Sequence, residues 1–219
     1  MRALSPEPRR GRAGRREAYR EQRQRYALAL LLGLGSLLLV VAIVSYSPED
    51  QDNIGFGWRE LLGVLRGDPA VQLRAESVRN WLGLLGAGIA QALVVFGIGY
   101  AAVSIPGVLG WWAWELVHRG TILPHVWRRS TAVAVVALLA AVFAGVLRSI
   151  PAMADLPLEW SGMIGAFMAT VLRQLLGTIG AILVTVAGIA LVLVLEFPRL
   201  GEGTWQKLRV GWARLRDWW

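Results

Sequence analysis

The sequence predicts an all-α integral membrane protein with four transmembrane helices, arranged as two parallel helical hairpin repeats and accompanied by interfacial amphipathic helices. Three observations support this prediction. Of the 219 residues, 55% are hydrophobic and only 17% are charged, whereas soluble domains carry nearer a quarter charged residues. Four apolar runs are long enough to cross about 30 Å of hydrocarbon as helices. No segment alternates polar and apolar residues over the roughly ten positions of a membrane β-strand.

The chain begins with an Arg-rich segment, residues 1–25, followed by the first apolar run. We expect residues 1–25 to be cytoplasmic and disordered, because they hold almost no apolar side chains to bury. The first span covers residues 27–46 and ends at an interfacial tyrosine, Tyr46, just before the helix-stopping Pro48. It is longer than a signal-peptide core and lacks an A-x-A-like cleavage site, so we expect it to remain as an anchor.

We place a four-helix domain at residues 26–198. An internal repeat divides the part of this domain that follows the first span. At a constant offset of 79, the residues Trp81, Gly83, Gly86 and Ala87 recur as Trp160, Gly162, Gly165 and Ala166. Both copies begin outside and run inward, which makes them parallel repeats. The Gly-rich halves, 82–92 and 161–173, then lie at the outer leaflet. The remaining spans become 93–116, 130–147 and 174–195, with outer loops 47–92 and 148–173.

Small residues four positions apart recur within these repeats, a spacing that lets membrane helices approach closely. The pairs are Gly86 with Ala90, Gly97 with Ala101, Gly162 with Ala166, and Gly177 with Ala181. They are candidates for helix packing inside one chain or for contacts between subunits, and the sequence leaves both open. Pro106 lies inside the second span, where we expect it to kink the helix.

The charge distribution predicts the orientation, because short positively charged segments stay in the cytoplasm. Residues 1–26 hold nine Arg against three Glu, a net charge of +6, and residues 115–129 and 196–219 carry +2 each. Residues 47–80 carry four Arg against six acidic residues, a net charge of −2, and residues 148–173 are neutral. Both termini are therefore expected in the cytoplasm. The overall charge of +8 needs no direct DNA binding to explain it.

The residue types that carry catalysis or metal binding are sparse. Cysteine is absent, and His118 and His125 have no nearby carboxylate cluster that would suggest a metal site. No G-x-x-x-x-G-K-[ST] motif is present, so no ATP-binding loop is predicted. We expect no catalytic residue, cofactor or metal in this chain. The spans have no ionisable residue away from their ends, which argues against a transporter or channel.

Two further segments suggest surface contacts. Residues 199–219 are predicted to form an amphipathic helix and the start of a linker. An apolar stripe comprises Trp205, Leu208, Trp212, Leu215 and Trp219, and basic residues lie beside it at Lys207, Arg209, Arg214 and Arg216. This helix suits the anionic inner leaflet, and docking on a partner domain is the alternative. In the loop 47–80, the apolar residues Phe56, Trp58, Leu61 and Leu62 either rest on the outer membrane face or contact a partner.

A longer set of motifs resembles a known family. They are Ser45-Tyr46-Ser47 with Glu49 and Asp50, Asn80-Trp81-Leu82-Gly83, Phe96-Gly97-Ile98-Gly99-Tyr100, Pro106, the tryptophans 111, 112 and 114, and the second-half motifs Gly162-Met163-Ile164-Gly165 and Leu176-Gly177-Thr178-Ile179-Gly180-Ala181. Together they resemble the N-terminal four-helix membrane domain of the FtsK/SpoIIIE DNA translocases, over about residues 26–198.

The resemblance implies a bacterial inner-membrane domain that localises to the division septum, contacts cell-division proteins and forms a homo-oligomer, a hexamer with its motor attached. In such proteins a cytoplasmic ATP-driven motor moves DNA, and that motor is absent from these residues. We therefore expect an anchor and assembly domain whose partners are membrane lipids and division proteins, with DNA contacted only through a motor. A free-standing membrane scaffold is the main alternative, and a small transporter is the weaker one.

Overall fold

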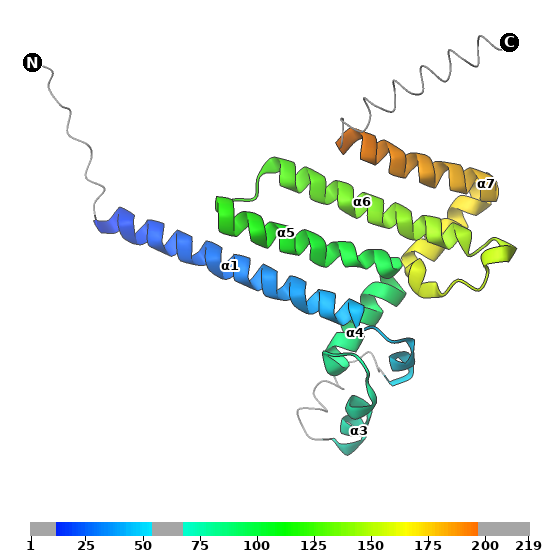
Figure 1. Cartoon of the computed structure of the whole chain (residues 1–219), viewed down its shortest axis with the longest axis horizontal. Coiled ribbons are helices and arrows are strands. Elements are labelled where there is room, and N and C mark those ends of the chain that lie inside the picture. Colours follow the sequence, from blue (N-terminus) through cyan, green and yellow to red (C-terminus); the bar gives the residue numbers. More distant parts are fainter. Residues whose placement is uncertain (1–11, 54–67, 197–219) are drawn as a thin grey trace, which may run out of the picture.

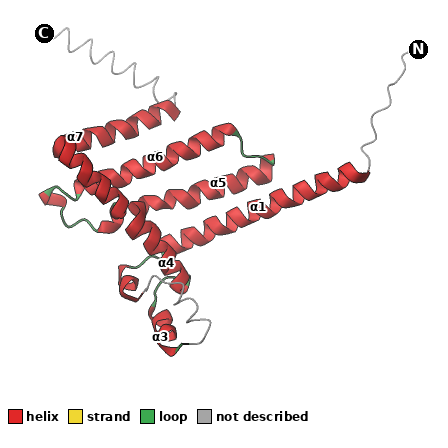
Figure 2. Cartoon of the chain, turned by 180° about the vertical axis from the view of Figure 1, so that it is seen from behind, coloured by secondary structure: helices red, strands yellow, loops and turns green. Residues whose placement is uncertain are grey.

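The computed structural model describes residues 12–53 and 68–196, and every regular element in these ranges is helical (Figure 2). The long helices are α1 (Arg12–Val44), α5 (Ser104–Arg119), α6 (Pro124–Leu147) and α7 (Gly162–Glu196). Shorter helices are α3 (Pro69–Ser77) and α4 (Gly83–Leu93). Four described segments are long and apolar enough to cross a membrane, as the sequence predicts: Tyr19–Val44, Gly83–Arg119, Pro124–Leu147 and Gly162–Glu196.

The helices α1, α5, α6 and the C-terminal part of α7 lie side by side in that order (Figure 1). The most extensive contacts join α1 to α5 and α6 to α7, so the chain folds as two helical hairpins that meet along α5 and α6. Large apolar side chains remain exposed on these helices, among them Leu30, Leu31, Ile179 and Leu183. A surface of this kind is suited to lipid tails, because helices satisfy their own backbone hydrogen bonds inside a bilayer.

Each hairpin returns through a helix that is interrupted at glycine. In the first hairpin, α4 is followed by a π-helical turn (Val94–Ile98) and a 3-10 turn (Gly99–Val103) before α5 begins. In the second, α7 changes direction at Gly177, which has φ 71° and ψ 173°. The segment before each interruption, α4 or the N-terminal part of α7, runs at an angle to the four parallel helices (Figure 1).

The predicted repeat is visible in the backbone. Gly83 and Gly162, which are 79 residues apart, begin α4 and α7 with φ of 62° and 61°. A small buried apolar cluster accompanies each interruption. One comprises Ile43, Val94 and Ala102, and the other Val142, Val146, Ala169 and Ala181. In each hairpin the segments on either side of the interruption thus pack onto the preceding long helix.

The helix boundaries differ from the predicted ones mainly at the N-terminus. The expectation of a disordered segment over residues 1–25 does not hold from Arg12 onward, because α1 begins there and continues without a break into the first span. Arg, Glu, Gln and Ala in this stretch are good helix formers, and an ion pair between Arg25 and Glu21 joins adjacent turns at 3.7 Å. The helix of the third span also begins earlier than the predicted 130, at Pro124.

Candidate functional site: the loop junction and the arginine-rich end

The loop that follows α1 is held by a buried carboxylate. Asp50 lies in the 3-10 turn Pro48–Asn53 and is only 2% exposed. Its two carboxylate oxygens accept hydrogen bonds from the backbone amides of Arg79 (2.8 Å) and Asn80 (3.1 Å). Glu49 forms an ion pair with the Arg79 guanidinium at 2.7 Å. These contacts bring the end of the 47–80 loop back to its beginning.

Asn80 then joins the end of α1 to the start of α4. Its side-chain amide donates to the carbonyl of Ala42 at 2.9 Å, and its side-chain oxygen accepts from the Leu82 amide at 3.1 Å. Ala42 is in the last turn of α1, where carbonyls lack partners within the helix. The Ser45 hydroxyl adds a second connection by accepting from the Trp81 amide at 3.2 Å. Together Ser45, Asp50 and Asn80 fix the geometry of the first hairpin.

The two hairpins meet at a polar and aromatic cluster, here called the loop junction, made of Tyr46, Gln51, Tyr100, Glu159 and Trp160. The Tyr46 hydroxyl donates to the Glu159 carboxylate at 3.3 Å, and the Gln51 amide donates to both groups. The Tyr100 ring lies edge-on between Tyr46 and Trp160, at centroid distances of 6.5 and 5.9 Å. Burial, opposed by the Gln51 hydrogen bond and aided by the Glu159 charge, raises the pKa of Tyr46 to about 12.

Directly beside the loop junction, backbone packs on backbone. A Cβ atom placed on Gly162 would overlap the carbonyl oxygen of Gly97 and lie 2.5 Å from the amide nitrogen of Gly99. A Cβ placed on Gly99 would lie 2.5 Å from the carbonyl oxygen of Glu159. Gly99 and Gly162 also have φ of 69° and 61°, which side-chain-bearing residues rarely adopt. Glycine at these positions therefore allows the start of α7 to contact the interruption of the first hairpin.

Helices α6 and α7 approach closely through small residues that the sequence analysis did not select. A Cβ placed on Gly165 would lie 2.7 Å from the Ala141 carbonyl oxygen, and one on Gly145 would lie 2.8 Å from the Ala169 Cβ. Ala141 and Gly145 are four residues apart on α6. The spacing that favours close helix packing thus occurs here too, but Ala141 and Gly145 lie outside the repeated segments.

The opposite end of the molecule, here called the arginine-rich end, gathers the basic residues of α5 and α6. Arg119 pairs with Glu115 at 3.2 Å, and Arg128 pairs with Glu196 at 3.1 Å, which joins α6 to the end of α7. Aromatic side chains join α5 to α6 nearby. The Trp112 indole donates to the Ser130 hydroxyl at 2.8 Å and stacks on Trp127 at a centroid distance of 5.3 Å.

The structure places the predicted packing residues in two different situations. Gly86, Ala90, Gly162 and Ala181 are buried within the chain, and Ala166 and Ala101 are partly buried. Gly97 and Gly177 are residues at which the helices depart from helical geometry, and the Gly97 backbone also packs against Gly162. Whether any of these residues also makes subunit contacts stays a prediction.

The interruption of the second span precedes Pro106. The backbone is non-helical at Gly97 (φ −86°, ψ −134°), and Gly99 has positive φ, whereas Pro106 is the third residue of α5. A proline in the first helical turn removes no hydrogen bond of the helix. The carbonyl oxygen of Pro106 accepts a hydrogen bond from the Ser36 hydroxyl at 2.7 Å, which joins α5 to α1.

Several predicted contact residues lie outside the described residues. They are the outer-loop candidates Phe56, Trp58, Leu61 and Leu62 and the tail residues Trp205, Lys207, Arg209, Trp212, Arg214, Arg216 and Trp219. Within the described ranges, no group of three His, Asp or Glu side chains is arranged to hold a metal ion. The polar groups of the loop junction bind one another, so the arrangement has a structural role.

The comparison with protein families agrees with this architecture. The family described as the 4TM region of DNA translocase FtsK/SpoIIIE matches residues 21–208, which include all four membrane-spanning segments. The chain belongs to this family. No curated protein and no solved structure matches the sequence of this chain. The matched region is a membrane domain of these translocases and does not include their motor.

The family match also bears on the hydrogen bonds that Ser45, Asp50 and Asn80 make between α1 and α4. The residues that carry the resemblance in the first outer loop, Ser45, Asp50 and Asn80, are those that join α1 to α4. The sequence motifs contain these residues but do not indicate their structural role. Their role depends on hydrogen bonds across about 30 residues, which periodicity does not encode.

Proposed function

We propose that this chain is the membrane-anchoring domain of a bacterial DNA translocase, that it localises to the division septum, and that it assembles as an oligomer there. The observation that carries the proposal is the match of residues 21–208 to the four-helix region of such translocases. The fold supports it, because four described segments are long and apolar enough to cross a membrane and polar contacts join the helices at both of their ends.

The orientation follows from the charges. The arginine-rich end holds Arg119, Arg128 and the Arg-containing start of α1. By the positive-inside rule, we propose that this end faces the cytoplasm at a bacterial inner membrane. The loop junction then lies on the outer face, where division proteins are its proposed partners. A C-terminal motor that moves DNA with ATP would begin beyond α7, on the cytoplasmic side.

The oligomer in this proposal is a homohexamer when the motor is attached. The four spans form a row with α1 and α7 at its two edges (Figure 1), which leaves both edges able to pack against another copy. Disulfide cross-linking between cysteines introduced on α1 and α7 tests this arrangement, because the chain has no native cysteine. A ladder of cross-linked species supports subunit contacts at these edges, and monomer alone counts against them.

Localisation tests the septal role. A fusion of this chain to a fluorescent protein, produced in dividing cells of the source bacterium, is expected to concentrate at the division site. A matched fusion carrying Asp50→Ala and Asn80→Ala, which disconnects the first outer loop from α1, is expected to remain in the membrane but lose this enrichment. Uniform membrane fluorescence of the unmodified fusion would instead favour a general membrane scaffold.

A further inference from the structure

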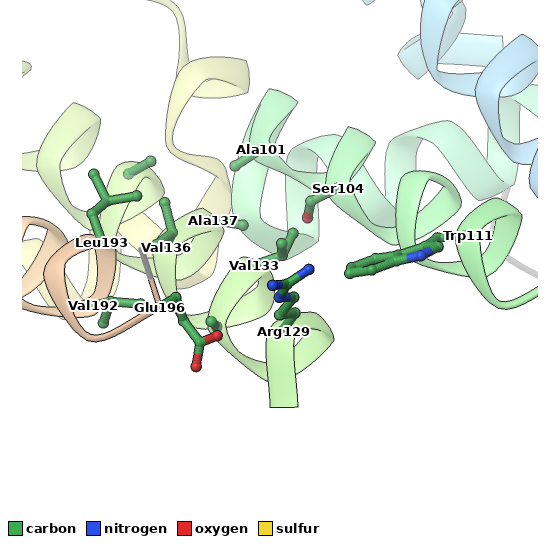
Figure 3. Close-up of a pocket in the computed structure, with 12 residues that line it drawn as sticks. Ala101, Ser104, Trp111, Arg129, Val133, Val136, Ala137, Val192, Leu193 and Glu196 are labelled. Atoms are coloured by element: carbon green, nitrogen blue, oxygen red, sulfur yellow. The ribbon is translucent and has the colours of Figure 1, made fainter. Parts of the chain in front are cut away.

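An apolar pocket of about 440 Å³ opens between α5, α6 and the C-terminal part of α7 (Figure 3). Aliphatic side chains of α6 and α7, among them Val133, Val136, Val192 and Leu193, supply most of its lining. A volume of this size is in the range of small-molecule and lipid sites. Because α5, α6 and α7 are membrane-spanning segments, the medium around this pocket is lipid.

The pocket has the length of one leaflet. Its lining on α6 extends from Arg129 to Ala140, which at 1.5 Å per helical residue corresponds to about 16 Å. One leaflet contributes about half of the roughly 30 Å hydrocarbon thickness. The pocket thus runs from the arginine-rich end to about the middle of the bilayer, as a single acyl chain does.

The charged groups lie at one end of this pocket. Arg129 directs its guanidinium toward Ser104 and Trp111 (Figure 3), and it has no ion pair with any of the residues that the structure describes. Glu196 at the same end pairs with Arg128 through one carboxylate oxygen. The other carboxylate oxygen of Glu196 is buried and has no hydrogen-bond donor among the described residues. These three side chains leave one net positive charge and one vacant acceptor.

We propose that this pocket binds an anionic glycerophospholipid with a hydroxylated headgroup, of the phosphatidylglycerol type, from the cytoplasmic leaflet. One acyl chain occupies the apolar part, the phosphate binds Arg129, and a headgroup hydroxyl donates to Glu196. Charged hydrogen bonds of guanidinium to phosphate are among the stronger ones in proteins. A zwitterionic lipid is disfavoured, because its headgroup has no net charge and leaves the net positive charge of this end uncompensated. The inference uses the orientation given above but not the septal role.

Native mass spectrometry of the purified full chain tests the headgroup interaction, with phosphatidylglycerol and phosphatidylethanolamine added in turn. We expect preferential retention of phosphatidylglycerol and a roughly tenfold loss of that preference in Arg129→Gln. The matched control is Arg23→Gln, which removes the same charge from an exposed position on α1. Arg129→Lys, which keeps the charge, is expected to retain most of the preference. Equal losses in the Arg129→Gln and Arg23→Gln variants would overturn the proposal, because non-specific attraction to basic residues would then explain the binding.

A second pair of variants tests the acyl-chain site independently. Ala140→Phe fills the pocket from an exposed position on α6 and is expected to abolish the retained lipid. Val184→Phe adds similar bulk on α7 outside the lining and is expected to leave retention unchanged. Unchanged retention in Ala140→Phe would overturn the proposal. Failure of the chain to reach the septum would affect the proposed function alone, since the lipid measurement uses purified protein.

Discussion

The contact between the two hairpins at Gly162 gives the most direct test of the fold. Gly162→Ala introduces a Cβ that overlaps the Gly97 carbonyl oxygen, at a residue with φ of 61°. Gly83 is the equivalent residue of the first repeat and has φ of 62°, but a Cβ placed there has no atom within 4 Å. The two substitutions therefore share the backbone penalty, and only one of them adds a clash.

The expected magnitudes follow from these two contributions. A non-glycine residue in the left-handed region costs about 1–2 kcal/mol, which is the whole expected effect of Gly83→Ala. Displacing well-packed backbone at Gly162 adds about 1–3 kcal/mol, so Gly162→Ala is expected to cost about 2–5 kcal/mol in total. Gly88→Ala is the control for replacing glycine with alanine at a position without backbone strain or a clash. Gly88 is helical with open space around it, and alanine there should stabilise α4 by about 0.5–1 kcal/mol.

Equilibrium unfolding in mixed micelles of a mild detergent and SDS measures these differences, with fluorescence of the 11 tryptophans as the signal. The expected order of stability is Gly88→Ala, then the unmodified chain, then Gly83→Ala, then Gly162→Ala. Equal losses for Gly83→Ala and Gly162→Ala would refute the reasoning, because they would show that the start of α7 does not contact the interruption of the first hairpin.

Two further predictions concern the loops. Asn80→Ala removes the hydrogen bonds to Ala42 and Leu82 at a position only 4% exposed, and it is expected to lower the free energy of unfolding by about 1–3 kcal/mol; a loss below about 0.5 kcal/mol would contradict the assigned role. The raised pKa of Tyr46 means that its neutral form is favoured in the folded state, so its contribution to stability is present below pH 10 and is lost as the pH rises toward about 12. Absorbance at the tyrosinate band should show one tyrosine fewer ionising near pH 12 in Tyr46→Phe than in the unmodified chain; an unchanged amplitude at high pH in the variant would contradict the assignment.

Much of the architecture was predictable because a bilayer imposes simple requirements on sequence. Each span must be apolar over about 20 residues, so hydropathy located four of them. The repeat was predictable because the same backbone geometry at Gly83 and Gly162 requires the same residue, and the surrounding Trp and Ala side chains repeat with it. Low apolar content predicts disorder for the residues before the first span, whereas the structure shows a helix from Arg12, because this segment extends an existing helix.

The role of individual glycines was less predictable. Glycine serves both close helix packing and a change of backbone direction, and its spacing in sequence does not distinguish the two uses. The spacing therefore predicts Gly97 and Gly177 as packing residues without indicating the interruption that the structure shows at each. Gly97 serves both uses, because its backbone also packs against Gly162. The loop junction was missed for another reason. Tyr46 and Glu159 are 113 residues apart, and no local pattern indicates that their side chains meet.

The central claim is that these four helices anchor a DNA motor in the membrane. The most direct test is the size of the native product in the source cell, measured by immunoblot with an antibody raised against residues 47–80. We expect a band far heavier than the 24.0 kDa of this chain if, as proposed, a motor follows the membrane domain in the same polypeptide. A single band at 24 kDa would contradict it and would favour a free-standing membrane scaffold.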